Sequence, residues 1–201
     1  MGRRGDGAAR GGGIDSGVKR VGLVALLAAA AVAGVAVWTV TSQPEWYQRV
    51  RYPLRYEAIV RTHARNYDLP PALVAAVIYA ESKFDASARS DAGAVGLMQL
   101  LPDTAQGIAV RTGGNGFVQS DLLDPEINVR YGSWYLRHLL DRYDDDVPTA
   151  LAAYHAGQGN VDAWRRRGVG IQFPETRTYV KRVLDAEKVY AEAYGDELSG
   201  A

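Results

Sequence analysis

An uncharged apolar run from Val21 to Val40 constrains this chain more than any other feature of its sequence. At about 1.5 Å per helical residue, a run of this length covers the roughly 30 Å hydrocarbon core of a bilayer. The residues before it carry a basic excess: Arg3, Arg4, Arg10, Lys19 and Arg20 against Asp6 and Asp15. Such a bias keeps a segment in the cytoplasm. The sequence therefore predicts a Gly/Arg-rich cytoplasmic tail over residues 1–20, a single transmembrane helix over 21–40 and an outer domain.

A cleaved signal peptide is the main alternative for this run. Ala31-Val32-Ala33 before Gly34 has the small-x-small pattern that signal peptidase reads, and cleavage near Ala33 would give a secreted protein. The apolar character continues through Val40, which a signal peptide does not need, so the pattern favours the anchor. A buried core helix is a third interpretation, but the basic flank has no packing role. The first two alternatives both place the later residues on the periplasmic or cell-wall side of the membrane.

Composition excludes several classes of partner and site. Lys+Arg and Asp+Glu are equal at 23 each, so no global field attracts nucleic acid. The chain has no cysteine, which excludes disulfides, a thiolate nucleophile and a cysteine-based zinc site. The acidic triplet Asp144-Asp145-Asp146 has no ligand spacing around it and is typical of a solvated turn. We therefore expect neither a metal nor a cofactor.

Helical periodicity dominates after Pro53, and no hairpin signal lies between alternating apolar runs. The sequence predicts an all-α domain over residues 54–195, preceded by a linker over 41–53 and followed by a tail over 196–201. Proline is a favoured first residue of a helix, and several of the expected helices start at one. The expected helices are Leu54–Tyr67, Pro71–Glu81, a short one after Pro102, Pro125–Tyr143, Val147–Tyr154 and a long one from Pro174.

Glu81 is an acidic residue on the apolar side of its predicted helix, because it follows Val74, Val77 and Ile78 by seven, four and three positions. Burial and the partial negative charge of a helix C-terminus both disfavour an ionised carboxylate. Both effects raise the pKa, and such a carboxyl can serve as a general acid near neutral pH. The alternative is a frayed helix end with Glu81 solvated near Lys83, and position alone does not decide between them.

The stretch Ser90–Gln99 is too rich in small residues for a strong helix and too apolar for an ordinary surface loop. Gly93 and Gly96 permit positive φ or close approach, Met98 offers an adaptable apolar contact, and Gln99 offers a donor and acceptors. A sugar needs this combination, since it has apolar ring faces, hydroxyls and N-acetyl groups. A tight turn packed on the core would have a similar composition.

Four motifs in order resemble the catalytic domain of the soluble lytic transglycosylases, the lysozyme-like enzymes of glycoside hydrolase family 23. The resemblance covers about Leu54 to Tyr194. It implies an all-α, lysozyme-like domain with a substrate cleft that needs no cofactor. The motifs are Glu81-Ser82, Gly96-Leu97-Met98-Gln99 with Ser90 before it, Ala153-Tyr154-His155-Ala156-Gly157, and Glu175-Thr176-Arg177-Thr178-Tyr179-Val180.

The resemblance implies that Glu81 is the sole catalytic carboxyl and that peptidoglycan glycan strands are the substrate. Glu81 would protonate the oxygen between N-acetylmuramic acid and N-acetylglucosamine, then accept the proton of the muramic C6 hydroxyl, giving a 1,6-anhydro product. His155 stands where the family usually has asparagine, and it fits a packing role as well as a substrate contact. The resemblance implies the remaining roles as follows: Ser90 and Gln99 contact the saccharide, Met98 lines the cleft, and Tyr154, Glu175 and Tyr179 surround the carboxyl.

Other functions remain open from the sequence. Retaining and inverting glycosidases use a second carboxyl, and Asp85 and Asp91 are the nearby candidates. We expect Asp85 to cap the end of its helix and Asp91 to hold the loop before Gly93 instead. A hydrolytic, lysozyme-type muramidase is the alternative within enzymes, and a non-catalytic glycan-binding module of a cell-envelope complex is the alternative outside them. Nothing in the sequence indicates a protein partner.

Overall fold

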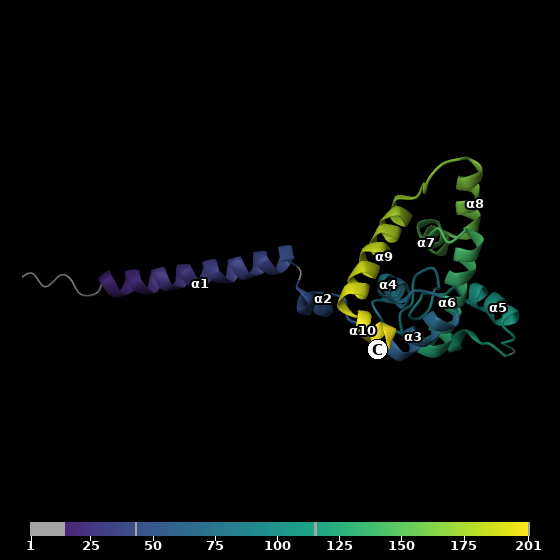
Figure 1. Ribbon diagram of the computed structural model, residues 1–201, viewed down its shortest axis with the longest axis horizontal. Coiled ribbons are helices and arrows are strands. Elements are labelled where there is room, and N and C mark those ends of the chain that lie inside the picture. The colour runs from purple at the N-terminus through teal and green to yellow at the C-terminus, as the bar shows by residue number, and fades with distance from the viewer. Residues whose placement is uncertain (1–14, 43, 115, 201) are drawn as a thin grey trace, which may run out of the picture. The chain divides into compact units, whose positions relative to one another are not determined.

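The computed structural model describes residues 15–42, 44–114 and 116–200, and it divides into two units, one up to Tyr47 and one from Gln48 (Figure 1). Most of the predicted cytoplasmic tail lies outside the described residues. The first unit contains helix α1 (Asp15–Ser42), which begins earlier than the predicted span. Its segment Arg20–Thr39 is long and apolar enough to cross a membrane, and its large apolar side chains, such as Leu26 and Trp38, are exposed.

The described part of the second unit is built from helices and contains no strand, only isolated bridges at Arg89–Val95 and Val95–Leu100. The prediction of an all-α fold is confirmed. Helix α2 begins at Glu45, just before the boundary between the units. The helices are α2 (Glu45–Arg51), α3 (Glu57–Asn66), α4 (Pro71–Ser82), α5 (Pro102–Arg111), the short 3₁₀ helix η1 (Gln119–Leu123), α6 (Pro125–Arg142), α7 (Val147–Ala156), α8 (Gln158–Arg166), α9 (Pro174–Ala193) and α10 (Gly195–Ser199).

Prolines begin the helices as the sequence indicates. Pro71, Pro102, Pro125 and Pro174 each occupy the first turn of their helix, where the missing N–H costs no hydrogen bond. Before Pro125, the Asp124 side chain accepts a 2.8 Å hydrogen bond from the Glu126 N–H and caps the helix.

Helix α4 lies in the middle of the second unit, with α9 along one side of it and α3 also packed against it (Figure 1). Every side chain from Leu73 to Ile78 is buried. A helix that is apolar on all sides belongs at the centre of a core. Any polar side chain on its last turn therefore emerges from the interior, and that turn carries Glu81.

Several boundaries differ from those that the sequence predicts. The expected linker over 41–53 includes α2, and the next helix begins at Glu57 because Tyr56 adopts a left-handed conformation with φ 54°. The expected tail over 196–201 contains α10, whose Leu198 is buried and packed in the main core. An ion pair of 2.6 Å between Arg49 and Glu197 ties α10 to α2. The sequence analysis missed helix α8, which follows α7 after a break at Gly157.

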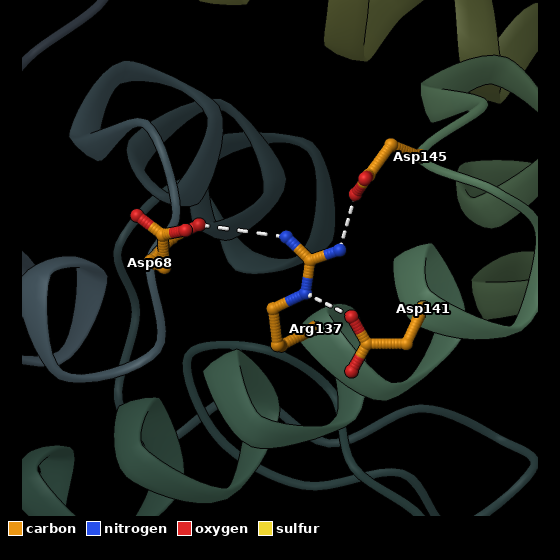
Figure 2. A network of polar contacts seen from close by, with 4 residues as sticks. All are labelled: Asp68, Arg137, Asp141 and Asp145. Atoms are coloured by element: carbon orange, nitrogen blue, oxygen red, sulfur yellow. Dashed lines mark hydrogen bonds and ion pairs between the residues drawn. The ribbon is translucent and has the colours of Figure 1, made fainter.

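Figure 2 shows Arg137 of α6 tying three segments together. Its Nε donates to Asp141 at 2.7 Å, one Nη donates to the Asp145 carboxylate before α7, and the other lies 3.5 Å from the Asp68 carbonyl oxygen before α4. The aspartate side chains are exposed, so each pair stabilises the fold only modestly. The network nevertheless joins the loops that lead into α4 and α7, the two helices that carry Glu81 and Tyr154.

Candidate active site

The last turn of α4 presents Glu81 and fixes the loop that follows. Lys83 ends the helix in a left-handed conformation with φ 53°. The hydroxyl of Ser82 donates to the Leu97 carbonyl oxygen at 2.8 Å, so the residue after Glu81 is bonded directly to the loop that carries Gln99. In the Glu-Ser pair, Ser82 therefore holds the loop in place, while Glu81 faces the cleft.

Asn128 of α6 fixes the same loop through three hydrogen bonds. Its amide nitrogen donates to the carbonyls of Val95 and Leu122, both at 2.9 Å, and its amide oxygen accepts from the Met98 N–H at 2.8 Å. The side chain is fully buried, so each bond also satisfies a group that would otherwise be costly to bury. Gly96 lies against this amide with φ 81°. The sequence analysis missed Asn128; a polar residue within the buried stripe of α6 was the available signal.

The loop, α4 and the end of α7 enclose a cleft of about 460 Å³, a size typical of ligand sites. Glu81 is the only carboxyl among its described lining residues, which are Glu81, Ser90, Ala92, Ala94, Gln99, Leu100, Leu101, Thr104, Tyr135, Tyr154, His155, Ala156 and Gly157. Asp85 is fully exposed and accepts hydrogen bonds from Ser87, and Asp91 is also exposed. No group of three His, Cys, Asp or Glu side chains in the described ranges could hold a metal.

Burial raises the pKa of Glu81 to about 7, against the opposing effects of a hydrogen bond from Tyr179 and the charge of Arg182. The Tyr179 hydroxyl donates to Glu81 Oε1 at 2.7 Å. Among the described residues the second carboxyl oxygen has no hydrogen-bond partner, and Glu81 lines the cleft. Near neutral pH this carboxyl is thus partly protonated and accessible from the cleft, as a general acid must be.

Two tyrosines flank Glu81, the half-buried Tyr154 and the buried Tyr179. Tyr154 donates to the Met98 carbonyl oxygen at 2.8 Å, and its ring lies 5.4 Å from that of Tyr135. Burial, reinforced by the nearby Glu81 charge, holds the pKa of both Tyr154 and Tyr179 well above the ordinary range. Both hydroxyls therefore stay neutral and can donate hydrogen bonds throughout the range in which Glu81 titrates.

His155 is a partly exposed residue of the cleft lining and is held on two sides. Its Nδ1 lies 3.1 Å from the buried Thr176 hydroxyl, and its ring is 4.5 Å from that of Tyr179. Partial burial and the Arg182 charge lower the pKa of His155, while Glu175 opposes them. The ring is therefore mostly neutral at the pH where Glu81 titrates and keeps one donor and one acceptor nitrogen.

The structure brings most of the expected site residues together, with two exceptions. Ser90, Gln99, Tyr154 and His155 line the cleft with Glu81, and Tyr179 reaches Glu81 from behind. The Met98 side chain does not line the cleft, because it is fully buried against Gly132. Glu175 is exposed in the first turn of α9, with no contact to Glu81. The sequence analysis also missed Arg182, one turn beyond Tyr179, which donates to the Ala80 carbonyl oxygen at 3.0 Å.

Comparison with known proteins supports a family assignment. The transglycosylase SLT domain family matches residues 58–170. The soluble lytic murein transglycosylase of Escherichia coli strain K12 is 32% identical over 158 residues, which are 73% of this chain and 24% of that protein. Membrane-bound lytic murein transglycosylase F of Aeromonas salmonicida strain A449 is 34% identical over 137 residues, 65% of this chain and 25% of that protein.

A solved structure shares the fold. The X-ray structure of an inactive mutant of lytic transglycosylase Slt from Pseudomonas aeruginosa aligns with a TM-score of 0.69 and 29% identity, over 80% of this chain and 28% of that one. The chain thus spans about a quarter of the length of these relatives. From the family match and the identity to the E. coli protein, we conclude that the chain belongs to the transglycosylase SLT domain family.

Proposed function

We propose that this protein is a peptidoglycan lytic transglycosylase that cleaves the β-1,4 bond between N-acetylmuramic acid and N-acetylglucosamine without consuming water. One observation carries the proposal: Glu81 is the single carboxyl on the described cleft surface, and burial raises its pKa to about 7. The names of the relatives, which include lytic murein transglycosylases, support the substrate class. The solved relative was made inactive by a glutamate-to-glutamine change, which fits a mechanism built on one carboxyl.

In the first step Glu81 acts as general acid. Its proton passes to the glycosidic oxygen, the bond from that oxygen to the muramic C1 breaks, and the N-acetylglucosamine side leaves as an alcohol. Positive charge develops at C1, and the substrate's own N-acetyl group is placed to stabilise it, because the described cleft lining offers no second carboxylate. The Tyr179 hydroxyl, 2.7 Å from Oε1, stabilises the carboxylate that remains.

In the second step the same carboxylate acts as general base. It accepts the proton of the muramic C6 hydroxyl while the C6 oxygen bonds to C1, which closes the 1,6-anhydro ring and restores the acid. A group with a pKa near 7 suits both roles, since it exchanges a proton readily in either direction near neutral pH. Ser90, Gln99 and His155 would bind hydroxyl and acetamido groups of the strand, and Tyr154 would form the floor beside the reacting bond.

Product analysis tests the proposal. Purified peptidoglycan is treated with the protein, and the released fragments are analysed by mass spectrometry. We expect 1,6-anhydromuramic ends, which are lighter than reducing ends by one water. Reducing ends instead would show hydrolysis of a lysozyme type, and no released fragment at all would leave a glycan-binding role.

Removing the Tyr179 hydroxyl is expected to move the pH profile of cleavage. The Tyr179 hydrogen bond lowers the pKa of Glu81, so in Tyr179→Phe the pKa rises further. Glu81 must be protonated to start the reaction, so the alkaline limb of kcat/KM, which falls through about pH 7 in the natural protein, shifts to higher pH. The measurement is the initial rate of strand cleavage from pH 5 to 9.

Tyr143→Phe is a matched control for that shift. Tyr143 is also a buried tyrosine that donates to a carboxylate, Asp162 at 3.0 Å, but it lies outside the cleft. Its loss should leave the alkaline limb in place. Equal shifts in the two variants would contradict a specific role for Tyr179.

We also propose that α1 anchors the protein, with the catalytic domain on the outer side of the cytoplasmic membrane. The apolar segment Arg20–Thr39 follows a basic flank, and a membrane-bound relative exists among the transglycosylases. Full-length protein should resist extraction of membranes with alkaline carbonate. A shorter soluble form beginning near Gly34 would instead show cleavage as a signal peptide.

A further inference from the structure

The short helix α2 presents an apolar surface to solvent. Its Trp46 and Val50 are one turn apart, on the same side of the helix, and are 58% and 76% exposed. Arg51 in the same helix and Arg55 in the loop that follows are exposed as well. None of these four residues lines the cleft. A tryptophan and an aliphatic side chain together with arginines are typical of helices that lie at the surface of a membrane.

Hydrogen bonds fix the backbone of α2 and of the residues just after it to the second unit. Three tyrosine hydroxyls donate to its carbonyl oxygens: Tyr79 to Arg51 at 3.0 Å, Tyr190 to Pro53 at 3.2 Å and Tyr194 to Arg49 at 3.2 Å. Of these, Tyr79 belongs to α4 and lies two residues before Glu81. A surface that binds α2 therefore also holds the helix that carries the catalytic acid.

The covalent chain keeps α2 close to the end of α1. Three Cα–Cα steps lead from Ser42 at the end of α1 to Glu45 at the start of α2, so these two residues are at most about 11 Å apart. The headgroup layer on each side of the hydrocarbon core of a bilayer is roughly 5 to 8 Å thick. With α1 across the membrane, α2 therefore begins in the headgroup layer or next to it. Lipid is the partner that its exposed apolar side meets first.

We propose that α2 lies on the outer surface of the membrane that α1 crosses, with Trp46 and Val50 among the lipid headgroups and with Arg51 and Arg55 directed to lipid phosphates. Tryptophan suits this layer because its ring is apolar and its N–H is polar. The inference rests on the anchoring proposed above and goes beyond it, because α2 adds a second point of attachment. The cleft is then held at one height above the bilayer and reaches the glycan strands at that height.

Dyes placed at single sites test the inference, because the natural chain contains no cysteine. Val50→Cys in α2, Val32→Cys in α1 and Val110→Cys in α5 are each labelled with a fluorophore in the full chain. Each protein is reconstituted in vesicles of phosphatidylethanolamine and phosphatidylglycerol. Val110 is the matched control, because its exposure of 71% is close to that of Val50. Lipids that carry a nitroxide on the headgroup should quench most of the emission from position 50 and little of that from position 110.

Trp46→Ser separates docking of α2 from mere proximity to α1, because the short connection between the helices is kept in this variant. Loss of the tryptophan ring should lower the quenching at position 50 by about 2-fold or more. Val118→Ser removes another exposed apolar side chain of the second unit and should leave that quenching unchanged. Quenching that Trp46→Ser does not alter, or quenching at position 50 as weak as at position 110, would overturn the inference.

The label at Val32 distinguishes failure of this inference from failure of the anchor. Lipids with the nitroxide deep in the acyl chain should quench it, since Val32 lies in the middle of the apolar segment. A quenched label at Val32 with an unquenched label at Val50 would overturn the inference alone, and a label at Val32 that neither lipid quenches would contradict the anchor as well. Release of anhydromuropeptides depends on neither label and tests the proposed chemistry separately.

Discussion

Glu81→Gln is expected to lower the rate of strand cleavage by at least about 10² to 10⁴, since general acid–base catalysis contributes on this order. Glutamine keeps the shape of the side chain and can still bond to Tyr179, but it neither gives nor accepts the proton at the glycosidic and C6 oxygens. The measurement is the release of anhydromuropeptides by the variant and by the natural protein at equal concentration. A comparable release would place the acid on another residue.

The same variant should be more stable than the natural protein at alkaline pH. The pKa of Glu81 is raised from 4.5 to about 7 in the folded state. As pH rises through that interval, the unfolded chain loses its proton before the folded chain does, so the natural protein loses stability, to a limit on the order of 3 kcal/mol. A glutamine side chain does not titrate, so the variant has no such pH-dependent loss of stability. The difference in the free energy of unfolding, measured in urea, should grow from pH 5 to pH 8, and a constant difference would contradict the elevated pKa.

Gly96→Ala is expected to destabilise the protein by about 3 to 5 kcal/mol, a large part of the stability of a typical domain. Gly96 has φ 81°, where an L side chain is strained. A Cβ there would lie 2.8 Å from the Asn128 Cγ and closer still to its amide nitrogen and the Leu122 carbonyl oxygen. Neither group can move, because Asn128 is buried and bonded to three backbone positions. The urea concentration at the midpoint of unfolding and the cleavage rate should both fall.

Gly93→Ala is the matched control. Gly93 has nearly the same φ, 84°, but beyond its chain neighbours no atom lies within 4 Å of the position of a Cβ. Its substitution has only the conformational cost of about 1 to 2 kcal/mol. The difference between the two variants therefore measures the close packing on Asn128, and equal losses would contradict it.

Local signals in the sequence were sufficient for much of the fold. Proline at the first turn located the starts of α4, α5, α6 and α9, because that signal acts within a single turn. The boundary at Tyr56 was missed, since a left-handed tyrosine is held by its surroundings and leaves no mark in its residue type. Helix α10 was mistaken for a tail, because Leu198 is buried only through contacts with distant helices.

The candidate site also combines features that local sequence signals predict with features that only distant contacts determine. The position of Glu81 on an apolar helix left both a buried and a solvated side chain open, and only the structure shows that it is largely buried. The family resemblance indicated Ser90, Gln99, Tyr154 and Tyr179 near it. Met98 was expected on the cleft surface, yet only its backbone takes part, through the carbonyl that binds Tyr154. Whether a side chain points up to the substrate or down to the core depends on the opposing helix, here Gly132, and no local pattern encodes that.

The packing of α10 has a practical consequence for work on this protein. Although it lies more than a hundred residues from Glu81 along the chain, α10 packs directly on α3 and α4, and Arg61 donates to the Glu197 carbonyl oxygen at 2.9 Å. Trimming the final turn to help crystallisation, or fusing a bulky reporter tightly against Leu198, would loosen the support under the acid itself. Expression vectors should therefore keep this short helix intact and attach any affinity handle through a flexible spacer.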